Sequence, residues 1–323
     1  MLDGFGREID YLRVSVTDRC DLRCVYCMPE RGVPSVSHEA ILRYEEILRL
    51  VRVMARLGVR HVRVTGGEPM LRRDCLSFVR ALGRVAGVES VSMTSNGLLL
   101  SDRLDALREL GLSSLNLSLD TLDPAAYARI TRGGDVRRVL RTLDGALDLG
   151  IPVKLNAVPV RGFNEDAVVP LAELARERPL RVRFIELMPL GAAKALRSVP
   201  QAELTAALEG AFGPMVPDPV QYGHGPARYW KPEGFTGSIG LIGAVSREFC
   251  ESCNRVRLTA DGRLKLCLNH SSGPDLRARL RGGADDAALE AAIRAAVAEK
   301  PERHCFSGGA ADPEGRSMNE IGG

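Results

Sequence analysis

The sequence predicts an α/β fold, an incomplete (βα)6 TIM-like barrel closed by a C-terminal extension. Over the first 190 residues, short apolar or β-branched segments alternate with amphipathic helical segments. This alternation is typical of βαβ units around a parallel sheet. Six such units fall short of the eight that close a full barrel. An open, doubly wound sheet is the alternative, because periodicity alone does not separate the two.

The predicted strands and helices of the barrel alternate along the chain, and capping residues and glycines mark several helix ends. Strands are expected at residues 11–16, 60–65, 89–94, 114–119, 152–158 and 181–187. Helices are expected at residues 38–57, 72–86, 102–110, 123–131, 135–149 and 164–177. Three polar residues precede periodic apolar positions and are predicted N-caps: Ser37, Asp102 and Asn164. Three glycines follow helical segments, where a left-handed C-terminal residue is expected: Gly58, Gly111 and Gly150.

The pattern changes after residue 190, so we predict a barrel domain at residues 1–190 and an extension at 191–323. Residues 213–243 are rich in glycine and proline and predict irregular loops with short strands.

Asp261-Gly262 is a hairpin turn signal between expected strands at 255–259 and 263–268. Helices at 275–281 and 285–299 precede a polar tail.

The composition limits the class of protein. The chain of 323 residues carries a net charge of +3 and 8 cysteines, too few for a disulfide scaffold. It has no apolar run of about 18 residues and no N-terminal secretion signal. We therefore expect a cytoplasmic protein in which clustered cysteines bind metal or act in catalysis. The sequence pI of 8.4 lies below the value of about 9 typical of nucleic-acid-binding domains, so neither nucleic acid nor membrane is an expected partner.

Cys20, Cys24 and Cys27 form a C-x3-C-x2-C motif directly after the first predicted strand. Three thiolates in one loop can hold a [4Fe–4S] cluster and leave one iron free to coordinate another molecule. A structural zinc site would need a fourth ligand, and no nearby residue supplies it. Three unrelated buried cysteines are the remaining alternative, although active sites of α/β barrels form at this end of the strands.

Cys250, Cys253 and Cys267 form a second group, spaced C-x2-C-x13-C around the predicted hairpin. The group fits a second cluster with an open iron, or a zinc site in which His270 is the fourth ligand. Cys75 falls on a predicted helix as a core residue, and Cys305 has no predicted role.

The first motif, with Tyr26 inside it, resembles the radical S-adenosylmethionine superfamily. The whole chain resembles its GTP 3′,8-cyclase (MoaA) family of molybdenum cofactor biosynthesis. The resemblance rests on LRVSVTDRC at 12–20, TGGEP at 65–69, TSNGL at 94–98, LNLSLD at 115–120, RFIELM at 183–188, CESCNRVRL at 250–258 and the Gly-Gly end. It thus covers nearly all of the chain.

The resemblance implies two [4Fe–4S] clusters and S-adenosylmethionine as cofactors. The first cluster would cleave S-adenosylmethionine to a 5′-deoxyadenosyl radical, which would abstract the ribose 3′ hydrogen of GTP. The carbon radical would then add to guanine C8, giving 3′,8-cyclo-7,8-dihydroguanosine triphosphate. The open iron of the second cluster would hold the guanine base.

Site residues follow from the motif matches. S-adenosylmethionine would contact Tyr26, Gly67, Ser118 and Met188. Taken alone, Met188 fits a core position and Ser118 a polar strand position. The triphosphate would contact Arg13, Arg63, Thr94, Lys154, Arg255 and Arg257. A cation inside a barrel is costly unless it meets an anion, and arginine suits phosphate oxygens. An outward-facing, solvated Arg63 is the alternative at that position.

The chain ends in Gly322 and Gly323, which the resemblance places in the active site. A frayed terminus is the ordinary interpretation of such an end, but two glycines could thread into a narrow pocket.

Two other function classes remain open at this point. One is a radical S-adenosylmethionine enzyme that modifies peptides, and the other is a ferredoxin-like carrier or a zinc-stabilised binding module. For the cyclase, the resemblance implies GTP, an external electron donor and a downstream pterin-forming synthase as partners. The loop-rich extension is compatible with a homodimer.

Overall fold

The computed structural model describes residues 1–306 and 314–322. The chain divides into two compact units, which are described separately. The first unit comprises Met1–Asp21, Arg31–Met93 and Cys250–Gly323, and the second comprises Leu22–Glu30 and Thr94–Phe249. The domain boundary expected after residue 190 stays a prediction.

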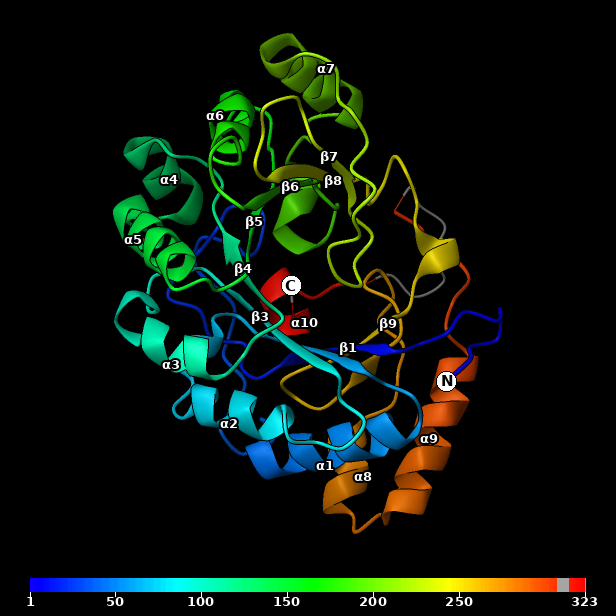
Figure 1. Ribbon diagram of the computed structural model, residues 1–323. Coiled ribbons are helices and arrows are strands. Elements are labelled where there is room, and N and C mark those ends of the chain that lie inside the picture. Colours follow the sequence, from blue (N-terminus) through cyan, green and yellow to red (C-terminus); the bar gives the residue numbers. More distant parts are fainter. Residues whose placement is uncertain (307–313, 323) are drawn as a thin grey trace. The chain divides into compact units, whose positions relative to one another are not determined.

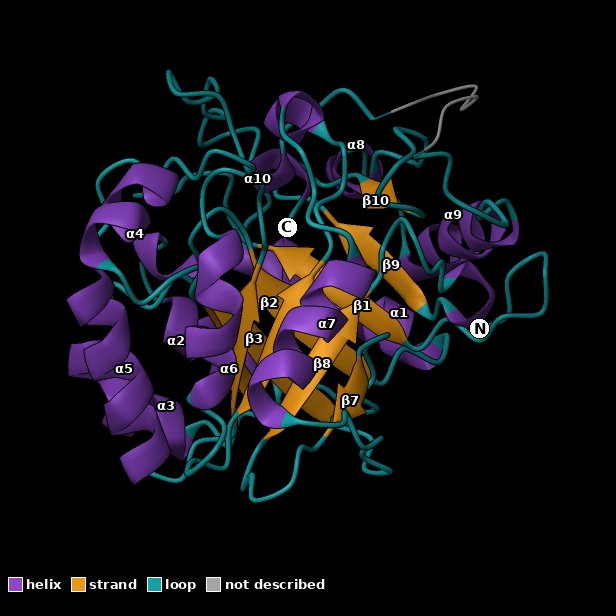
Figure 2. Cartoon of the chain, turned by 90° about the horizontal axis from the view of Figure 1, so that it is seen from above, coloured by secondary structure: helices purple, strands orange, loops and turns teal. Residues whose placement is uncertain are grey.

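In the first unit, strands run in the order β10-β9-β1-β2-β3. Their bounds are β1 (Tyr11–Ser15), β2 (His61–Thr65), β3 (Ser90–Ser95), β9 (Arg255–Leu258) and β10 (Leu264–Lys265). The strands β9, β1, β2 and β3 are parallel, whereas β10 returns antiparallel to β9. Figure 2 shows β9 beside β1, so the extension adds a strand to the sheet at that edge.

The helices of this unit are α1 (Tyr44–Arg56), α2 (Cys75–Leu82), α8 (Leu276–Arg281), α9 (Asp286–Ala298) and α10 (Met318–Ile321), with short 3-10 turns η1 (Pro69–Leu71) and η5 (Cys250–Ser252). Figure 1 shows α1, α2 and α9 on one side of β1 and α10 on the other.

The strands of the first unit have one apolar and one polar face. Side chains alternate along a strand, so Leu12 and Val14 lie opposite to Arg13. Leu12, Val14, Val64 and Val256 are fully buried. The polar face therefore carries the arginines of β1, β2 and β9, and it is the face on which a site can form.

In the second unit, strands run in the order β4-β5-β6-β8-β7, parallel except for β7. Their bounds are β4 (Ser114–Ser118), β5 (Val153–Ala157), β6 (Arg181–Ile185), β7 (Arg228–Trp230) and β8 (Ser238–Ile242). The helices are α3 (Leu104–Glu109), α4 (Pro124–Thr131), α5 (Val136–Asp148), α6 (Val168–Glu173) and α7 (Gln201–Phe212), with 3-10 turns η2 (Ser101–Arg103), η3 (Glu165–Ala167) and η4 (Gly191–Ala195).

All six predicted barrel strands are confirmed, as are the hairpin at Gly262 and the short strands within 213–243. Gly58, Gly111 and Gly150 have φ of 107°, 62° and 69°, which confirms their left-handed positions. The helix α7 is not among the predicted elements. Its buried residues Leu204 and Leu208 stand at i and i+4, a spacing that would have indicated it.

Two of the three predicted N-caps, Ser37 and Asp102, are wrong, and the third, Asn164, holds the N-cap position of η3 without a side-chain cap bond. The helix α1 begins at Tyr44 rather than after Ser37, with Arg43 as its N-cap. Asp102 lies inside η2 and caps nothing. Asn164 precedes η3 but makes no side-chain cap bond. Its side-chain Oδ1 instead accepts a hydrogen bond from the backbone N of Val160, at 2.8 Å.

Glu46 explains where α1 starts. Its carboxylate accepts hydrogen bonds from the backbone N of Arg43 at 2.7 Å and from Nε of Arg281 at 2.8 Å. The hydrogen bonds of Arg281 are the largest cause that lowers the pKa of Glu46 to about 2.

No helix in the described part of the chain is both long and apolar enough to cross a membrane.

Replacing Glu46 with Gln should lower the free energy of unfolding by about 2 kcal/mol at pH 7. The folded-state pKa lies below the ordinary value of 4.5, so the ionised form stabilises the fold above about pH 5. This contribution is lost as the pH falls toward 2. Urea unfolding of the two chains between pH 7 and pH 3 measures the difference, and the exposed Glu45→Gln change is the matched control. A difference that stays constant over this range would contradict the assignment.

Candidate active site

A row of arginines crosses three neighbouring strands of the first unit. Arg13 on β1 is the register partner of Arg63 on β2 and of Arg257 on β9. Register partners in a parallel sheet point to the same face, and Arg255 shares it because it stands two residues before Arg257. The structure therefore brings together four of the six predicted triphosphate contacts. Arg63 donates from Nε to Ser92 Oγ at 3.2 Å, and its guanidinium lies 5.6 Å from the centre of the Tyr11 ring, so it is not outward-facing.

The arginines depress one another's affinity for a proton. Burial lowers the pKa of Arg13 well below its ordinary value, and the charges of Arg257 and Arg63 lower it further. Burial, followed by the charge of Arg255, lowers the pKa of Arg257 to about 10. The Nε atom of Arg257 is buried and has no hydrogen-bond partner among the described residues. A bound polyanion would accept a hydrogen bond from Nε of Arg257, and its negative charge would reduce the repulsion between the arginines.

The other two predicted triphosphate contacts lie in the second unit. Lys154 on β5 is buried, and its Nζ donates to the carbonyl oxygen of Tyr222 at 2.8 Å. The hydroxyl of Thr94 is buried without a hydrogen-bond partner in the part of the chain that the structure describes.

The second cysteine group borders the arginine row. Cys250 opens η5, Cys253 ends that turn by donating its backbone N to the carbonyl oxygen of Cys250 at 3.1 Å, and Cys267 follows β10. None of the three is in a disulfide. Burial would raise the pKa of Cys253, but the charges of Lys300, Arg255 and Arg257 outweigh it and lower the pKa to about 7. A thiol that ionises near neutral pH fits a metal ligand, because the thiolate is the ligating form.

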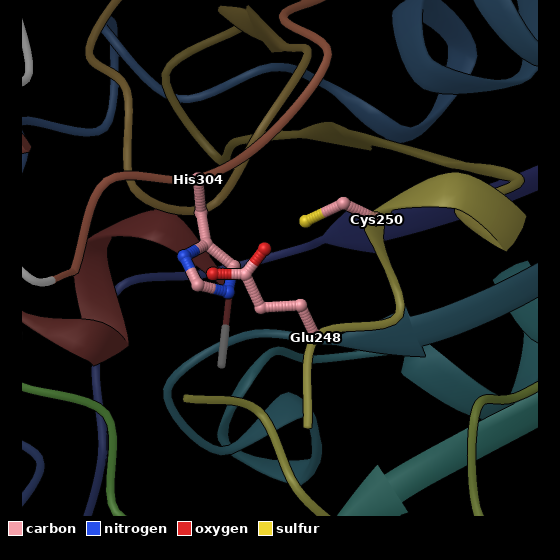
Figure 3. Close-up of side chains that lie close together, drawn as sticks. All are labelled: Glu248, Cys250 and His304. Atoms are coloured by element: carbon pink, nitrogen blue, oxygen red, sulfur yellow. The ribbon is translucent and has the colours of Figure 1, made fainter. Parts of the chain in front are cut away.

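Three residues that the sequence analysis missed surround this group. Lys300 is buried and donates from Nζ to the carbonyl oxygen of Leu266, and its charge acts on Cys253 and Cys267. Arg7 donates to the carbonyl oxygens of Cys250 at 2.8 Å and Glu302 at 2.7 Å, which holds residues 300–304 beside the cysteines. Figure 3 shows the sulfur of Cys250 directed toward the ring of His304, and their ligand atoms lie within 4.8 Å of each other. No sequence pattern indicated these three residues, because they lie far from Cys250 and Cys253 along the chain and come close to them only in the folded structure.

In the first cysteine motif, Cys20 belongs to the first unit and the other two cysteines to the second. The backbone N atoms of Cys27 and Met28 both donate to the carbonyl oxygen of Cys24, at 2.9 and 3.2 Å. This turn presents Cys24 and Cys27 from one short loop. Both are partly buried and neither is in a disulfide, which is compatible with a metal cluster bound by their thiolates.

Gly67 is required by close backbone packing. A Cβ atom at this position would stand 2.2 Å from the carbonyl oxygen of Arg19, directly before Cys20. The backbone N of Glu68 donates to the same oxygen at 2.7 Å. The glycine thus lets the TGGEP turn lie against the start of the cysteine loop.

The remaining predicted S-adenosylmethionine contacts belong to the second unit. Ser118 ends β4, and Met188 follows β6 by three residues. Tyr26 donates its hydroxyl to Oδ2 of Asp120 at 2.7 Å. Burial and the neighbouring Asp120 charge raise the pKa of Tyr26 well above its ordinary value, so its hydroxyl remains a donor. Asp120 is a further residue that the sequence analysis did not single out.

The C-terminal tail returns to the strand ends of the first unit. Gly322 has φ of 76°, and a Cβ atom there would lie 3.0 Å from Cβ of Ser15 at the carboxyl end of β1. Asn319 donates from Nδ2 to the carbonyl oxygen of Asp18 at 3.0 Å, and Glu314 forms a buried ion pair with Lys265. The described part of the tail is therefore docked rather than frayed. Gly323 lies outside the described residues.

Comparison with known proteins decides the family. The Radical SAM superfamily model matches residues 14–175, and the Molybdenum Cofactor Synthesis C model matches residues 180–306. The chain is 49% identical over 327 residues to the GTP 3′,8-cyclase of Pelotomaculum thermopropionicum and 45% identical over 326 residues to that of Moorella thermoacetica, each over the full length of both proteins. The chain belongs to the GTP 3′,8-cyclase family.

Family membership confirms the resemblance seen in the sequence and makes the chain a radical SAM enzyme. Among solved structures, SuiB of Streptococcus suis bound to S-adenosylmethionine matches with a TM-score of 0.64, covering 98% of this chain and 78% of SuiB. At 13% identity this likeness concerns the fold alone. It confirms the predicted α/β partial barrel against the open, doubly wound alternative.

The charge around Cys253 gives a prediction for the iron-free cyclase-family chain. Alkylation of Cys253 by iodoacetamide should be half-maximal near pH 7, against an ordinary thiol value of 9.0. The Lys300→Met change should move this midpoint upward, because Lys300 is the strongest of the cations that lower the pKa. Mass spectrometry of the Cys253 peptide measures both, with the exposed Lys194→Met change as control. Equal midpoints in the wild-type and Lys300→Met chains would refute the charge assignment.

Proposed function

We propose that this chain cyclises GTP to 3′,8-cyclo-7,8-dihydroguanosine triphosphate, the first step of molybdenum cofactor biosynthesis. The observation that carries the proposal is the arginine row that borders the second cysteine group. A partly buried row of like charges is stabilised by a polyanion, and the triphosphate of GTP has the matching charge and oxygen geometry.

The first cysteine motif would hold a [4Fe–4S] cluster through Cys20, Cys24 and Cys27. When bound, this cluster supplies the electron that cleaves S-adenosylmethionine and starts hydrogen abstraction from the ribose. Three protein thiolates leave one iron for the amino acid part of S-adenosylmethionine. Tyr26, Gly67, Ser118 and Met188 would hold the rest of that molecule, which is consistent with Ser118 and Met188 standing at strand ends.

The triphosphate would lie on the polar face of β9, β1 and β2. Arg13, Arg63, Arg255 and Arg257 would neutralise it, and Thr94 and Lys154 would complete its contacts. The buried hydroxyl of Thr94 and the buried Nε of Arg257 both lack a hydrogen-bond partner among the described residues, as a binding site for an absent ligand would.

The second cysteine group would hold a second cluster through Cys250, Cys253 and Cys267, and its open iron would bind the guanine base. Because Arg255 and Arg257 follow Cys253 on the same strand, one nucleotide could meet the cluster with its base and the arginines with its phosphates. Gly322 would close the site from the tail. Such positioning matters because a misplacement of about 1 Å can cost roughly 100-fold in rate.

The reaction also requires partners. An external electron donor must reduce the first cluster, and a pterin-forming synthase must consume the cyclised triphosphate. A reducing, cytoplasmic location would suit these partners, because clustered cysteines bind metal in such a compartment.

Anaerobic reconstitution with iron and sulfide tests the proposal. The wild-type chain should bind about eight irons and release 5′-deoxyadenosine in a GTP-dependent manner. The Cys24→Ala chain should lose about four irons and all cleavage, because it loses a ligand of the first cluster. The Cys253→Ala chain should also lose about four irons but retain cleavage that is uncoupled from GTP conversion.

The Cys75→Ala chain is the matched control, since Cys75 lies outside both groups in the core. A wild-type chain with about four irons and one zinc would show that the second group binds zinc. Cleavage that is independent of GTP, or that requires a peptide, would contradict the cyclase assignment.

A further inference from the structure

We propose that Asp120 is the positioning residue that fixes Tyr26, and with it the loop of the first cluster, in the orientation that binds S-adenosylmethionine. This inference rests on the proposed function, since it concerns the same cofactor site. Asp120 ends the LNLSLD motif, and the sequence analysis gave it no role.

The carboxylate of Asp120 uses both oxygens. Oδ2 accepts the Tyr26 hydroxyl at 2.7 Å, and Oδ1 accepts the backbone N of Val158 at 2.8 Å. Asp120 is only 2% exposed, so water does not compete effectively for these bonds. One short hydrogen bond at each oxygen restricts rotation of the carboxylate.

Because of its position in the fold, Asp120 connects the cysteine loop to two strands through these hydrogen bonds. Asp120 follows the end of β4 by two residues, and Val158 directly follows β5, its parallel neighbour. Tyr26 stands between Cys24 and Cys27. A single carboxylate therefore ties the cysteine loop to the carboxyl ends of two adjacent strands, the edge at which Ser118 also lies.

A second layer holds Asp120 itself. Nδ2 of Asn164 donates to the carbonyl oxygen of Asp120 at 2.8 Å and to that of Val158 at 3.2 Å. The Tyr26 side chain packs against a buried cluster that contains Val160 and Leu187. Leu187 immediately precedes Met188. Tyr26 therefore packs against the cluster that contains the neighbour of Met188, and both are predicted S-adenosylmethionine contacts.

The chemistry of the hydrogen bond between Asp120 and Tyr26 also favours a role in orienting Tyr26 over a role in packing alone. Burial raises the pKa of Asp120 to about 6, while the hydrogen bonds from Val158 and Tyr26 oppose this rise. Burying a carboxylate is costly unless its hydrogen bonds are satisfied, and an uncharged partner would serve packing alone. A hydrogen bond to a charged acceptor is stronger and more directional than a neutral one, and it orients the ring.

Binding of S-adenosylmethionine to the reconstituted chain tests this assignment, measured by the change it causes in the electron paramagnetic resonance spectrum of the reduced first cluster. Tyr26→Phe removes only the hydroxyl and should raise the Kd by about tenfold. Asp120→Ala should raise it at least as much, whereas Asp120→Asn, whose uncharged amide has one acceptor oxygen for two donors, should recover only part of the affinity. Iron content should stay at the wild-type value in all three variants.

A double variant distinguishes positioning from general destabilisation. If Asp120 acts through Tyr26, Tyr26→Phe combined with Asp120→Ala should bind no worse than Asp120→Ala alone. The matched control is Tyr44→Phe, which removes a tyrosine hydroxyl bonded to the carbonyl oxygen of Arg73 and should leave the Kd unchanged. Because Asp120→Ala could impair folding, the Kd of Tyr26→Phe, which keeps the packed ring, is the measurement that tests the positioning role.

A wild-type Kd in Tyr26→Phe and Asp120→Ala would overturn the inference. Additive losses in the double variant would overturn it as well. The proposed function fails separately, through the absence of GTP conversion by the wild-type chain, whereas this inference depends only on the ratio of Kd values between variants.

Discussion

The self-repulsion of the arginine row is the constraint on which the rest of the site depends. Arg13, Arg63 and Arg257 occupy matched positions on adjacent strands, which lie about 4.8 Å apart. Burial is the largest cause that lowers the pKa values of Arg13 and Arg257, and the like charges of neighbouring arginines lower them further. The apolar face of the same strands stabilises the sheet that holds them. In the proposed function, a bound triphosphate would replace this repulsion between arginines with attraction between the arginines and the phosphates.

The predicted extension at 191–323 contributes two of the four arginines and the second cysteine group. Its strand β9 pairs with β1 and thereby places Arg255 and Arg257 next to Arg13, directly after Cys253. The same cations, with Lys300, lower the pKa of Cys253 to about 7 and favour the ligating thiolate. In the proposed function, the same cations would therefore serve both the phosphates and the second cysteine group. In the second unit, Asp120 performs the analogous task for the first cysteine loop, through hydrogen bonds to Tyr26 and Val158 rather than through charge pairing.

Local patterns predicted much of this arrangement. Strand alternation placed Arg13 and Arg63 within β1 and β2, and short spacings indicated both cysteine groups. What sequence could not supply is the result of contacts between distant segments. Arg281 fixes the start of α1 through Glu46. Arg7 holds the segment around Lys300 and His304 beside Cys250. Asn164 has the signature of a helix cap, yet it bridges Asp120 and Val158 because tertiary partners compete successfully with the local cap.

The most direct test of the arginine account uses a ligand that has only the phosphates. The midpoint of thermal unfolding of the reconstituted chain should rise with added inorganic tripolyphosphate, because a ligand that binds only the folded state stabilises it. Arg257→Met should remove most of that rise, while the exposed Arg228→Met control should retain it. An unchanged midpoint with tripolyphosphate, or an equal rise in Arg257→Met, would contradict a row of arginines built for a triphosphate.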